Sequence, residues 1–247
     1  MVIRRSREGV DWLEFSILAG LKHGSMLRNG GASQGECDSL NFAFDRDLEA
    51  HVHENFARTQ KVLELDTIRY VSQQMHGATI VEVNRSSPIV LPPCDALVTA
   101  DVDVPLLIRH ADCQAAILYD PGKRVLALAH AGWRGSVQNI YGEVIKTLQI
   151  RYGCQPPDLL VGISPSLGPQ SAEFVNYRTE LPETFWKYQT MPSYFDFWAI
   201  SQAQLMECGV RPEHIELARV CTYINTKDCF SARRNREAGR HGTVACM

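Results

Sequence analysis

The sequence predicts a protein of the α+β (mixed α/β) class, with mixed or largely antiparallel sheets instead of a doubly wound parallel sheet. Short apolar runs outnumber the helical patterns, and such runs bounded by turn residues are typical of strands. Several of these runs are joined by segments too short to contain a crossover helix, which favours antiparallel neighbours. With 247 residues, 45% of them hydrophobic, the chain is long enough to bury a substantial core.

The predicted elements follow one another without an internal repeat or a low-complexity linker. Residues 30–35 are rich in Gly and Ser and are expected to form a loop. A first helix is predicted from Glu54 to Leu65, and a later one from Trp198 to Glu207, closed by Gly209. Strands are predicted at Tyr70–Ser72, Thr79–Val83, Ala96–Thr99, Pro105–Arg109, Ala115–Tyr119, Val125–Ala129, Leu159–Ile163 and Leu217–Val220. No clear boundary interrupts the series, so residues 1–247 are expected to form a single domain.

Residues 129–135, Ala-His-Ala-Gly-Trp-Arg-Gly, stand between a predicted buried strand and a predicted helix. Ser136 is available as the N-cap of that helix. The apolar residues beyond it have helical spacing: Val137, Ile140, Tyr141, Val144, Ile145 and Leu148. The two glycines permit tight backbone geometry, and the N-terminus of a helix attracts anions. A turn that only reversed the chain would not need His, Trp and Arg, so we interpret 129–135 as an active-site turn.

Three polar residues interrupt or end apolar segments and form a candidate catalytic zinc site: His76, Cys113 and His130. Two imidazoles and a thiolate suit Zn²⁺, and three protein ligands keep a fourth position open. The spacing alone is also compatible with polar residues that are satisfied within the core. A third interpretation makes Cys113 a nucleophile with His130 or His76 as its base.

Other polar segments are less specific. His51 and His53 form a His-X-His pair of the spacing used in copper oxidases, but a multicopper centre needs several such pairs, and a polar helix start is the favoured interpretation. Arg28, between Gly24 and Gly30, is expected to lie in a flexible loop, where it fits either a phosphate contact or a solvated side chain. The segments Phe230–Arg234 and Gly239-Arg240 fit either an anion contact or a plain surface role.

Composition and charge are those of an ordinary soluble protein. The net charge of −3 and the absence of a long basic run argue against nucleic acid as the main partner. No stretch approaches the roughly 20 apolar residues of a membrane span. The acidic residues of the first 14 positions argue against a signal peptide. The eight cysteines include no Cys-X-X-Cys pair, so we expect reduced thiols and a cytoplasmic location.

A series of short segments along nearly the whole chain has the order of a known family. These segments are His23-Gly24-Ser25, Arg28, Gly30–Ser33, Ser39–Asn41, Glu54-Asn55, Gln74–Gly77, Asp95–Thr99, Ala111–Cys113, Ala129–Gly135, Ser166–Pro169, Cys221–Tyr223, Phe230–Arg234 and Gly239-Arg240. They resemble the laccase-domain family, also called YfiH-like, bacterial polyphenol oxidase or peptidoglycan editing factor. The run 129–135 is the most specific of them.

The resemblance implies a three-layer α/β fold with mixed sheets, similar to a toxin-type cysteine hydrolase fold. The family's zinc ligands fall on His76, Cys113 and His130, which would also be the catalytic residues. The resemblance also implies phosphorolysis of purine nucleosides (adenosine, inosine, guanosine and methylthioadenosine) and deamination of adenosine at the same site. The expected partners are therefore a nucleoside and phosphate, bound by a monomer or small homo-oligomer.

Two alternatives to this activity stay open: copper-dependent oxidation of phenols at the same three-ligand site, and an accessory role in quality control of cell-wall precursors. For the phosphate and the substrate, the expected contacts are Arg28, Asn41 and Arg134.

The chain also departs from the family pattern. His110 stands where the family usually has Thr, Ser164 where Gly is usual, and Ala232 where Tyr is usual. His110 is expected to line the pocket or approach the metal. His110 and Asp112 are the candidates for the general acid at the purine.

Overall fold

The computed structural model describes residues 1–247 except 69 and 72, and it contains two six-stranded sheets. The first sheet has the order β1 (Val2–Arg7), β2 (Val10–Phe15), β3 (Lys22–Met26), β14 (His241–Cys246), β7 (Leu106–His110) and β4 (Tyr70–Val71). The second has the order β13 (Ile215–Leu217), β10 (Leu160–Ile163), β8 (Gln114–Asp120), β9 (Val125–Ala131), β6 (Ala96–Thr99) and β5 (Ile80–Glu82). Among the strands formed by the described residues, parallel pairs occur only at the sheet edges (β4–β7, β5–β6 and β10–β13), and the other pairs are antiparallel. The predicted class and sheet type are confirmed.

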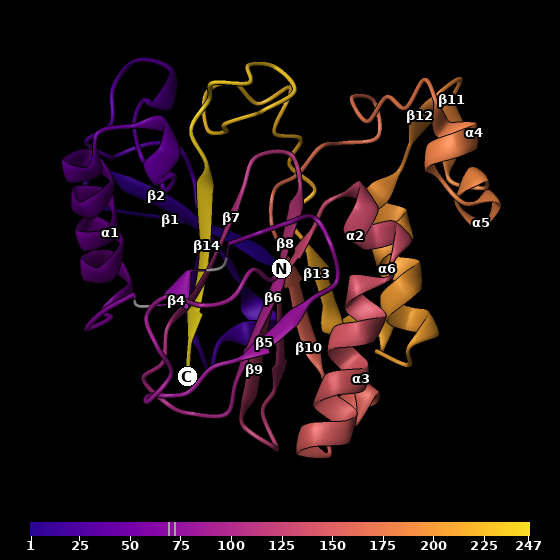
Figure 1. Ribbon diagram of the computed structural model, residues 1–247, viewed down its shortest axis with the longest axis horizontal. Helices are drawn as coiled ribbons and strands as arrows, with labels where there is room; N and C mark the ends of the chain where they lie inside the picture. Colours follow the sequence, from indigo (N-terminus) through magenta and orange to yellow (C-terminus); the bar gives the residue numbers. More distant parts are fainter. Residues whose placement is uncertain (69, 72) are drawn as a thin grey trace.

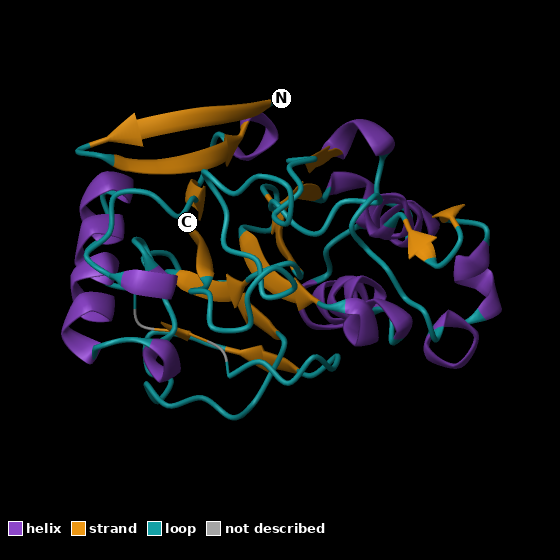
Figure 2. Cartoon of the chain, turned by 90° about the horizontal axis from the view of Figure 1, so that it is seen from above, coloured by secondary structure: helices purple, strands orange, loops and turns teal. Residues whose placement is uncertain are grey.

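The helices lie outside the two sheets, which pack against each other (Figures 1 and 2). The α-helices are α1 (Glu49–Leu63), α2 (Trp133–Val137), α3 (Ile140–Tyr152), α4 (Tyr177–Glu180), α5 (Glu183–Trp186) and α6 (Phe197–Glu207). Short 3₁₀ turns occupy Ser16–Leu18, Gly35–Cys37, Phe44–Arg46, Pro156–Asp158 and Pro212–His214. Among the described residues, no helix is long and apolar enough to cross a bilayer.

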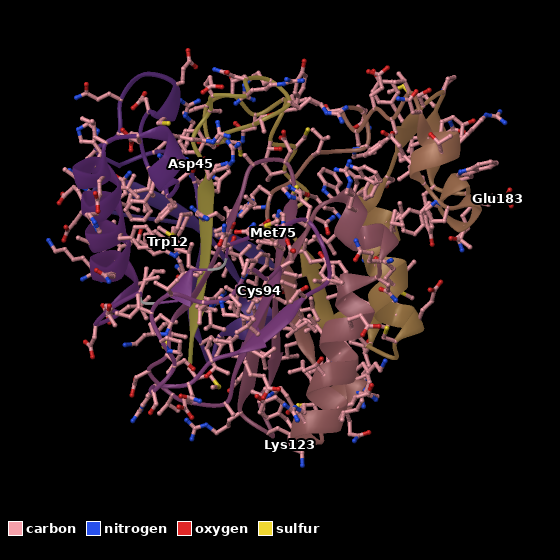
Figure 3. The ribbon with its side chains drawn as sticks, in the orientation of Figure 1. Trp12, Asp45, Met75, Cys94, Lys123 and Glu183 are labelled. Carbon is pink, nitrogen blue, oxygen red and sulfur yellow. The ribbon has the colours of Figure 1, made fainter. Side chains whose placement is uncertain are left out.

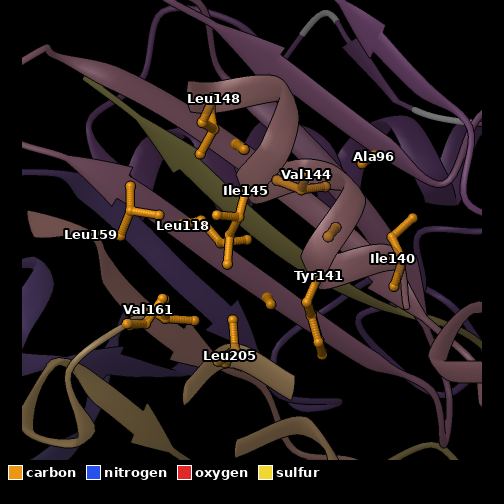
Figure 4. Close-up of a cluster of buried hydrophobic side chains, with 14 of the residues drawn as sticks. Ala96, Leu118, Ile140, Tyr141, Val144, Ile145, Leu148, Leu159, Val161 and Leu205 are labelled. Carbon is orange, nitrogen blue, oxygen red and sulfur yellow. The ribbon is translucent and has the colours of Figure 1, made fainter. Parts of the chain in front are cut away.

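Three hydrophobic cores hold these elements together. One lies between the two sheets, and another joins α1 to the first sheet through Val52, Phe56 and Leu63. The third joins α3 and α6 to the second sheet, with Tyr141 and Leu118 fully buried (Figure 4). Strands β8 and β9 are buried along their whole length, which explains why they appear in the sequence as continuous apolar runs.

The segment between β10 and α6 leaves the sheets and folds into a small aromatic unit. It carries α4, α5 and the two-stranded β11 (Gln189–Met191) and β12 (Tyr194–Phe195), at the upper right of Figure 1. Its cluster of Phe174, Phe185 and Phe195 packs against Trp133 and Leu167. This unit therefore adjoins the turn that the sequence singles out as an active-site turn.

Several predicted boundaries need correction. The helix predicted from Glu54 begins earlier, at Glu49, and the strand predicted at Leu217–Val220 lies at Ile215–Leu217. Ser136 does not cap the helix after the turn, because the chain first forms α2 and breaks at Asn139, whose side chain accepts a hydrogen bond from the Gly142 amide. Of the strand predicted at Tyr70–Ser72, Ser72 lies outside the described residues.

Candidate metal centre

The side chains of His76, Cys113 and His130 come together where three segments meet between the sheets. His76 lies in the turn after β4, Cys113 directly precedes β8, and His130 is near the end of the neighbouring β9. Their ligand atoms all lie within 4.8 Å of one another. This donor set of two imidazoles and one thiolate fits Zn²⁺ with an open fourth position, so the residues present fit a catalytic metal.

A buried carboxylate, Asp95, holds two of the three side chains in place. Its Oδ1 lies 2.9 Å from His130 Nδ1, which leaves Nε2 of that ring for the site. The same carboxylate accepts hydrogen bonds from the backbone amides of Met75, His76 and Gly77, at 3.2, 2.9 and 2.8 Å. Asp95 is not among the site residues predicted from the sequence, although an acidic residue directly before the apolar strand 96–99 is a signal that could identify it.

The turn that carries His76 has an uncommon backbone conformation and packs closely against Gly132. His76 itself has a φ of 61°, in the left-handed region. Its ring meets that of His130 edge to face, with centroids 4.9 Å apart. A Cβ atom placed on Gly132 would lie 2.9 Å from His76 Cδ2 and 3.1 Å from Cys113 Sγ. Gly132 therefore leaves the space that the side chains of His76 and Cys113 occupy, while its own backbone is ordinarily extended.

Charges within the cluster favour an ionised thiolate in the metal-free protein. Burial opposes ionisation of Cys113, but the facing His130 and His76 outweigh it and lower the pKa of the thiol. The pKa of His130 is correspondingly raised, against burial, by Cys113 and Asp95. Burial alone would raise the pKa of Asp95, yet the hydrogen bonds from His130 and from the turn amides lower it. A thiolate is the form that binds a metal.

Replacing Asp95 by Asn is expected to weaken metal binding about 10- to 100-fold, because outer carboxylates orient histidine ligands and raise their basicity. The amide keeps the size of the side chain but accepts fewer hydrogen bonds from His130 and the turn. Competition with a chromogenic chelator measures the affinity. Asp120→Asn, a buried carboxylate at the far end of β8, is the matched control. Equal affinity in the Asp95 variant and the wild type would contradict the positioning role.

Cys113 in chelator-treated protein is expected to react with iodoacetamide with a pH midpoint at least one unit below the ~8.5 of an ordinary thiol. The reason is the lowered pKa: the reactive thiolate persists as pH falls and is lost only below the shifted value. Buried Cys94, Cys154 and Cys229 have raised pKa values and should react slowly. Peptide mass spectrometry across pH 5–9 measures the profile. An ordinary midpoint at Cys113 would show that the histidines do not stabilise its thiolate.

One side of the cluster opens into a cavity of about 590 Å³, here called the aromatic cavity. It is lined by the metal-site residues His76 and Cys113, by the polar residues Asp112, Gln114, Arg134 and Arg233, and by Trp133, Leu167, Phe174 and Phe197. Phe174 packs on Phe197 with ring centroids 5.2 Å apart, and the Arg134 guanidinium stacks 4.3 Å from the Trp133 ring centroid. Flat apolar walls beside a few polar groups suit a small planar ligand.

The two candidates for the general acid are differently placed. Asp112 lines the aromatic cavity, where its carboxylate accepts hydrogen bonds from the Thr222 hydroxyl at 2.6 Å and from the Arg233 amide at 2.7 Å. His110 does not line this cavity. Its buried ring lies 2.9 Å, through Nε2, from the Thr243 hydroxyl, and it faces a second cavity described below.

Of the three expected anion contacts, only Arg134 lines the aromatic cavity. Arg28 stacks 5.0 Å from the Phe230 ring centroid and donates to the carbonyls of Asp38 and Thr226. Asn41 is fully buried and bonds the backbone of Ala43. Neither Arg28 nor Asn41 lines the aromatic cavity, so their contact with substrate stays a prediction.

The His-X-His pair lies at the start of α1, as expected. His51 and His53 bond carboxylates four residues before them, at 3.1 and 3.2 Å. Among the described residues, only His76, Cys113 and His130 form a group of three such side chains close enough to hold an ion. The described part of the chain therefore contains no second metal cluster.

The fold is that of a mixed α/β protein, and beside its cavity lies a cluster of two histidines and one cysteine that could hold a metal ion. The family described as multi-copper polyphenol oxidoreductase laccase matches residues 22–247, and the chain belongs to this family. The laccase-domain resemblance seen in the sequence is thereby confirmed.

Named relatives and solved structures agree with this assignment. The chain is 30% identical to purine nucleoside phosphorylase YlmD of Geobacillus stearothermophilus, covering 93% of this chain and 92% of the relative. It is 31% identical to a purine nucleoside phosphorylase of Pseudomonas aeruginosa, covering 89% and 90%. The crystal structure of the Geobacillus YlmD superposes with a TM-score of 0.88 at 28% identity, covering 100% and 99% of the two chains. Bacillus licheniformis YfiH, at 23% identity, shares the fold with a TM-score of 0.89.

Proposed function

We propose that this protein is a zinc-dependent purine nucleoside phosphorylase that cleaves adenosine, inosine, guanosine and methylthioadenosine and also deaminates adenosine to inosine. The observation that carries the proposal is the aromatic cavity, which opens directly onto the His76, Cys113 and His130 cluster. Relatives at about 30% identity bear the name purine nucleoside phosphorylase, which supports the same activity.

The aromatic cavity supplies the binding side of the reaction. Trp133, Phe174 and Phe197 offer ring surfaces for a purine, and stacking on aromatic side chains is a common way of holding a base. Asp112 lines the same cavity with a carboxylate, whose oxygens accept hydrogen bonds. A purine held there would have its sugar beside the metal ligands, where bond cleavage gains most from fixed orientation.

The metal cluster and its neighbours would stabilise the charges that develop during the reaction. Phosphorolysis builds positive charge on the sugar and negative charge on the departing purine, so positioned charges lower the barrier. A zinc ion held by His76, Cys113 and His130 would supply Lewis acidity and would lower the pKa of a bound water to about 7. Asp95 keeps His130 oriented for that role.

Product analysis with adenosine, in the presence and absence of phosphate, tests the proposal. Adenine and ribose 1-phosphate that form only with phosphate would support phosphorolysis, and inosine that forms without phosphate would support deamination. No conversion of adenosine, inosine, guanosine or methylthioadenosine by zinc-loaded protein would contradict the proposed function.

The alternative activity, copper-dependent oxidation of phenols, has the family's description in its favour. Against it stands the single three-residue cluster of the described chain, because multicopper oxidation needs several copper centres. Metal analysis matched to reaction rates separates the two: nucleoside turnover that rises with zinc content favours the phosphorylase, whereas phenol oxidation that rises with copper content favours the oxidase.

An accessory role in cell-wall precursor quality control predicts that variants without the metal ligands keep their biological effect.

A further inference from the structure

A second cavity, of about 290 Å³, contains three arginine side chains and is here called the arginine cavity. Arg46 comes from a 3₁₀ turn near the N-terminus, Arg109 from β7, and Arg240 from the residue before β14. One carboxylate, that of Asp45, also lines the arginine cavity, and its side chain is 70% exposed. In Figure 3, Asp45 is labelled beside the upper end of β14. Positive charge therefore exceeds negative charge at this wall.

The arginine cavity adjoins the aromatic cavity at the metal cluster. His76, Cys113, Ala111 and Ala232 line both cavities. The side chains of Ala111 and Ala232 are small, so little bulk separates the two spaces at these positions. Ligands bound in the two cavities would thus meet at His76 and Cys113.

Among the described residues, the guanidinium groups of Arg46 and Arg240 have no carboxylate oxygen within hydrogen-bonding distance. Arg46 donates to the Arg236 carbonyl, and its nearest acidic groups, on Asp45 and Glu237, are exposed and 3.8 to 3.9 Å away. Arg240 donates through Nη1 to backbone carbonyls, which leaves its other nitrogens without a protein acceptor among the described residues. Such groups bind phosphate well, because a planar guanidinium offers paired donors.

Burial and mutual repulsion make this cluster unfavourable without an anion. Burial lowers the pKa of Arg240, and the neighbouring Arg46 lowers it further. Burial likewise lowers the pKa of Arg109. His110, also at this wall, is buried, and its Nδ1 has no partner in the described part of the chain. An anion in the arginine cavity would relieve the repulsion and offer hydrogen-bond partners.

We propose that the arginine cavity binds the inorganic phosphate that attacks a nucleoside held in the aromatic cavity, an inference that rests on the proposed phosphorylase function. An oxygen of HPO₄²⁻ forms a bond to ribose C1′ while the C1′–N9 bond breaks, its electron pair going to the purine. The hydrogen of HPO₄²⁻ balances the proton that the purine takes up, so the products are free base and ribose 1-phosphate. On this assignment Arg46 and Arg240 are the principal phosphate contacts, while the contacts expected from the sequence at Arg28, Asn41 and Arg134 stay a prediction.

Isothermal titration with sodium phosphate, together with steady-state kinetics, tests this assignment in Arg46→Gln and Arg240→Gln. Each variant is expected to bind phosphate about 10- to 100-fold more weakly, since each loses a charge-assisted contact. The KM for phosphate should rise by a similar factor, while the KM for the nucleoside changes little. Arg151→Gln, an exposed arginine of α3 paired with Glu82, is the matched control and should behave as wild type. Circular dichroism verifies that all variants are folded.

The binding measurement separates failure of this inference from failure of the proposed function. Weak phosphate binding in both cavity variants, with the control unchanged, supports the site. If the wild-type protein binds phosphate through these arginines but cleaves no nucleoside, the arginine cavity is an anion site. Its role as the site of the co-substrate would then be overturned. Folded variants that bind phosphate as tightly as wild type would overturn the assignment. Arginine-dependent binding of adenosine 5′-monophosphate without binding of free phosphate would also overturn it, because the phosphate group would then belong to a nucleotide.

Discussion

Cys113→Ala is expected to abolish stoichiometric zinc binding and to lower nucleoside turnover by about 10³-fold or more. The thiolate is the only anionic donor among the three clustered side chains. The alanine side chain has no atom that could bind the metal in its place. Alanine leaves the neighbouring strand β8 unchanged, so thermal stability without metal should shift little. Metal analysis by mass spectrometry and the product assay with phosphate measure the two effects on one preparation.

The matched control for this variant is Cys208→Ala, which removes a thiol at the end of α6, away from the cluster. It should retain zinc and turnover. A Cys113→Ala protein that keeps one zinc per chain but loses activity would refute the ligand assignment and favour Cys113 as a nucleophile. A protein that keeps both would remove Cys113 from the site altogether.

Gly132→Ala is expected to weaken zinc binding more than about 100-fold while the protein remains folded. The new methyl group would lie 2.9 Å from the ring of His76 and 3.1 Å from Cys113 Sγ, closer than van der Waals contact permits. The His76 turn is pinned by Asp95, so it cannot move aside without losing those hydrogen bonds. Two ligands are therefore displaced together. Zinc affinity and the melting temperature of the metal-free protein measure the effect.

Gly20→Ala controls for the general cost of adding a methyl group to a loop glycine, since no atom outside its own segment lies within 4 Å of a Cβ there. It should bind zinc as wild type does. Wild-type affinity in Gly132→Ala would show that the turn has room to adjust. A metal-free Gly132→Ala protein that fails to fold would show instead that the glycine serves the fold more than the site.

The sequence predicts the central strands well because burial on both faces gives them continuous apolar runs. The strand at Ala96–Thr99 is confirmed with its predicted bounds, and β8 and β9 contain the predicted Ala115–Tyr119 and Val125–Ala129. The first sheet is harder to predict. Strand β1 is an edge strand whose outer part is exposed and carries arginines, so it shows no apolar alternation.

The candidate site is partly predictable for a related reason. The three side chains of the cluster, His76, Cys113 and His130, interrupt apolar segments, so they can be recognised in the sequence. The structure brings their ligand atoms together. The aromatic walls leave no such signal, because Phe174 comes from the segment between β10 and α6 and Phe197 is the first residue of α6. The arginine cavity depends even more on distant contacts, since its guanidinium groups come from the two ends and the middle of the chain.

The position of β14 has a consequence for the order in which the protein assembles on the ribosome. Strand β14 lies between β3 and β7 and is hydrogen-bonded to both. Until residues 241–246 leave the ribosome, residues 22–26 and 106–110 each have one strand edge without its hydrogen-bonded neighbour. Open edges of this kind invite pairing with other chains. The second sheet, whose strands end at residue 217, is free to form earlier. Nascent chains should therefore depend on chaperone protection of the first sheet until synthesis reaches β14.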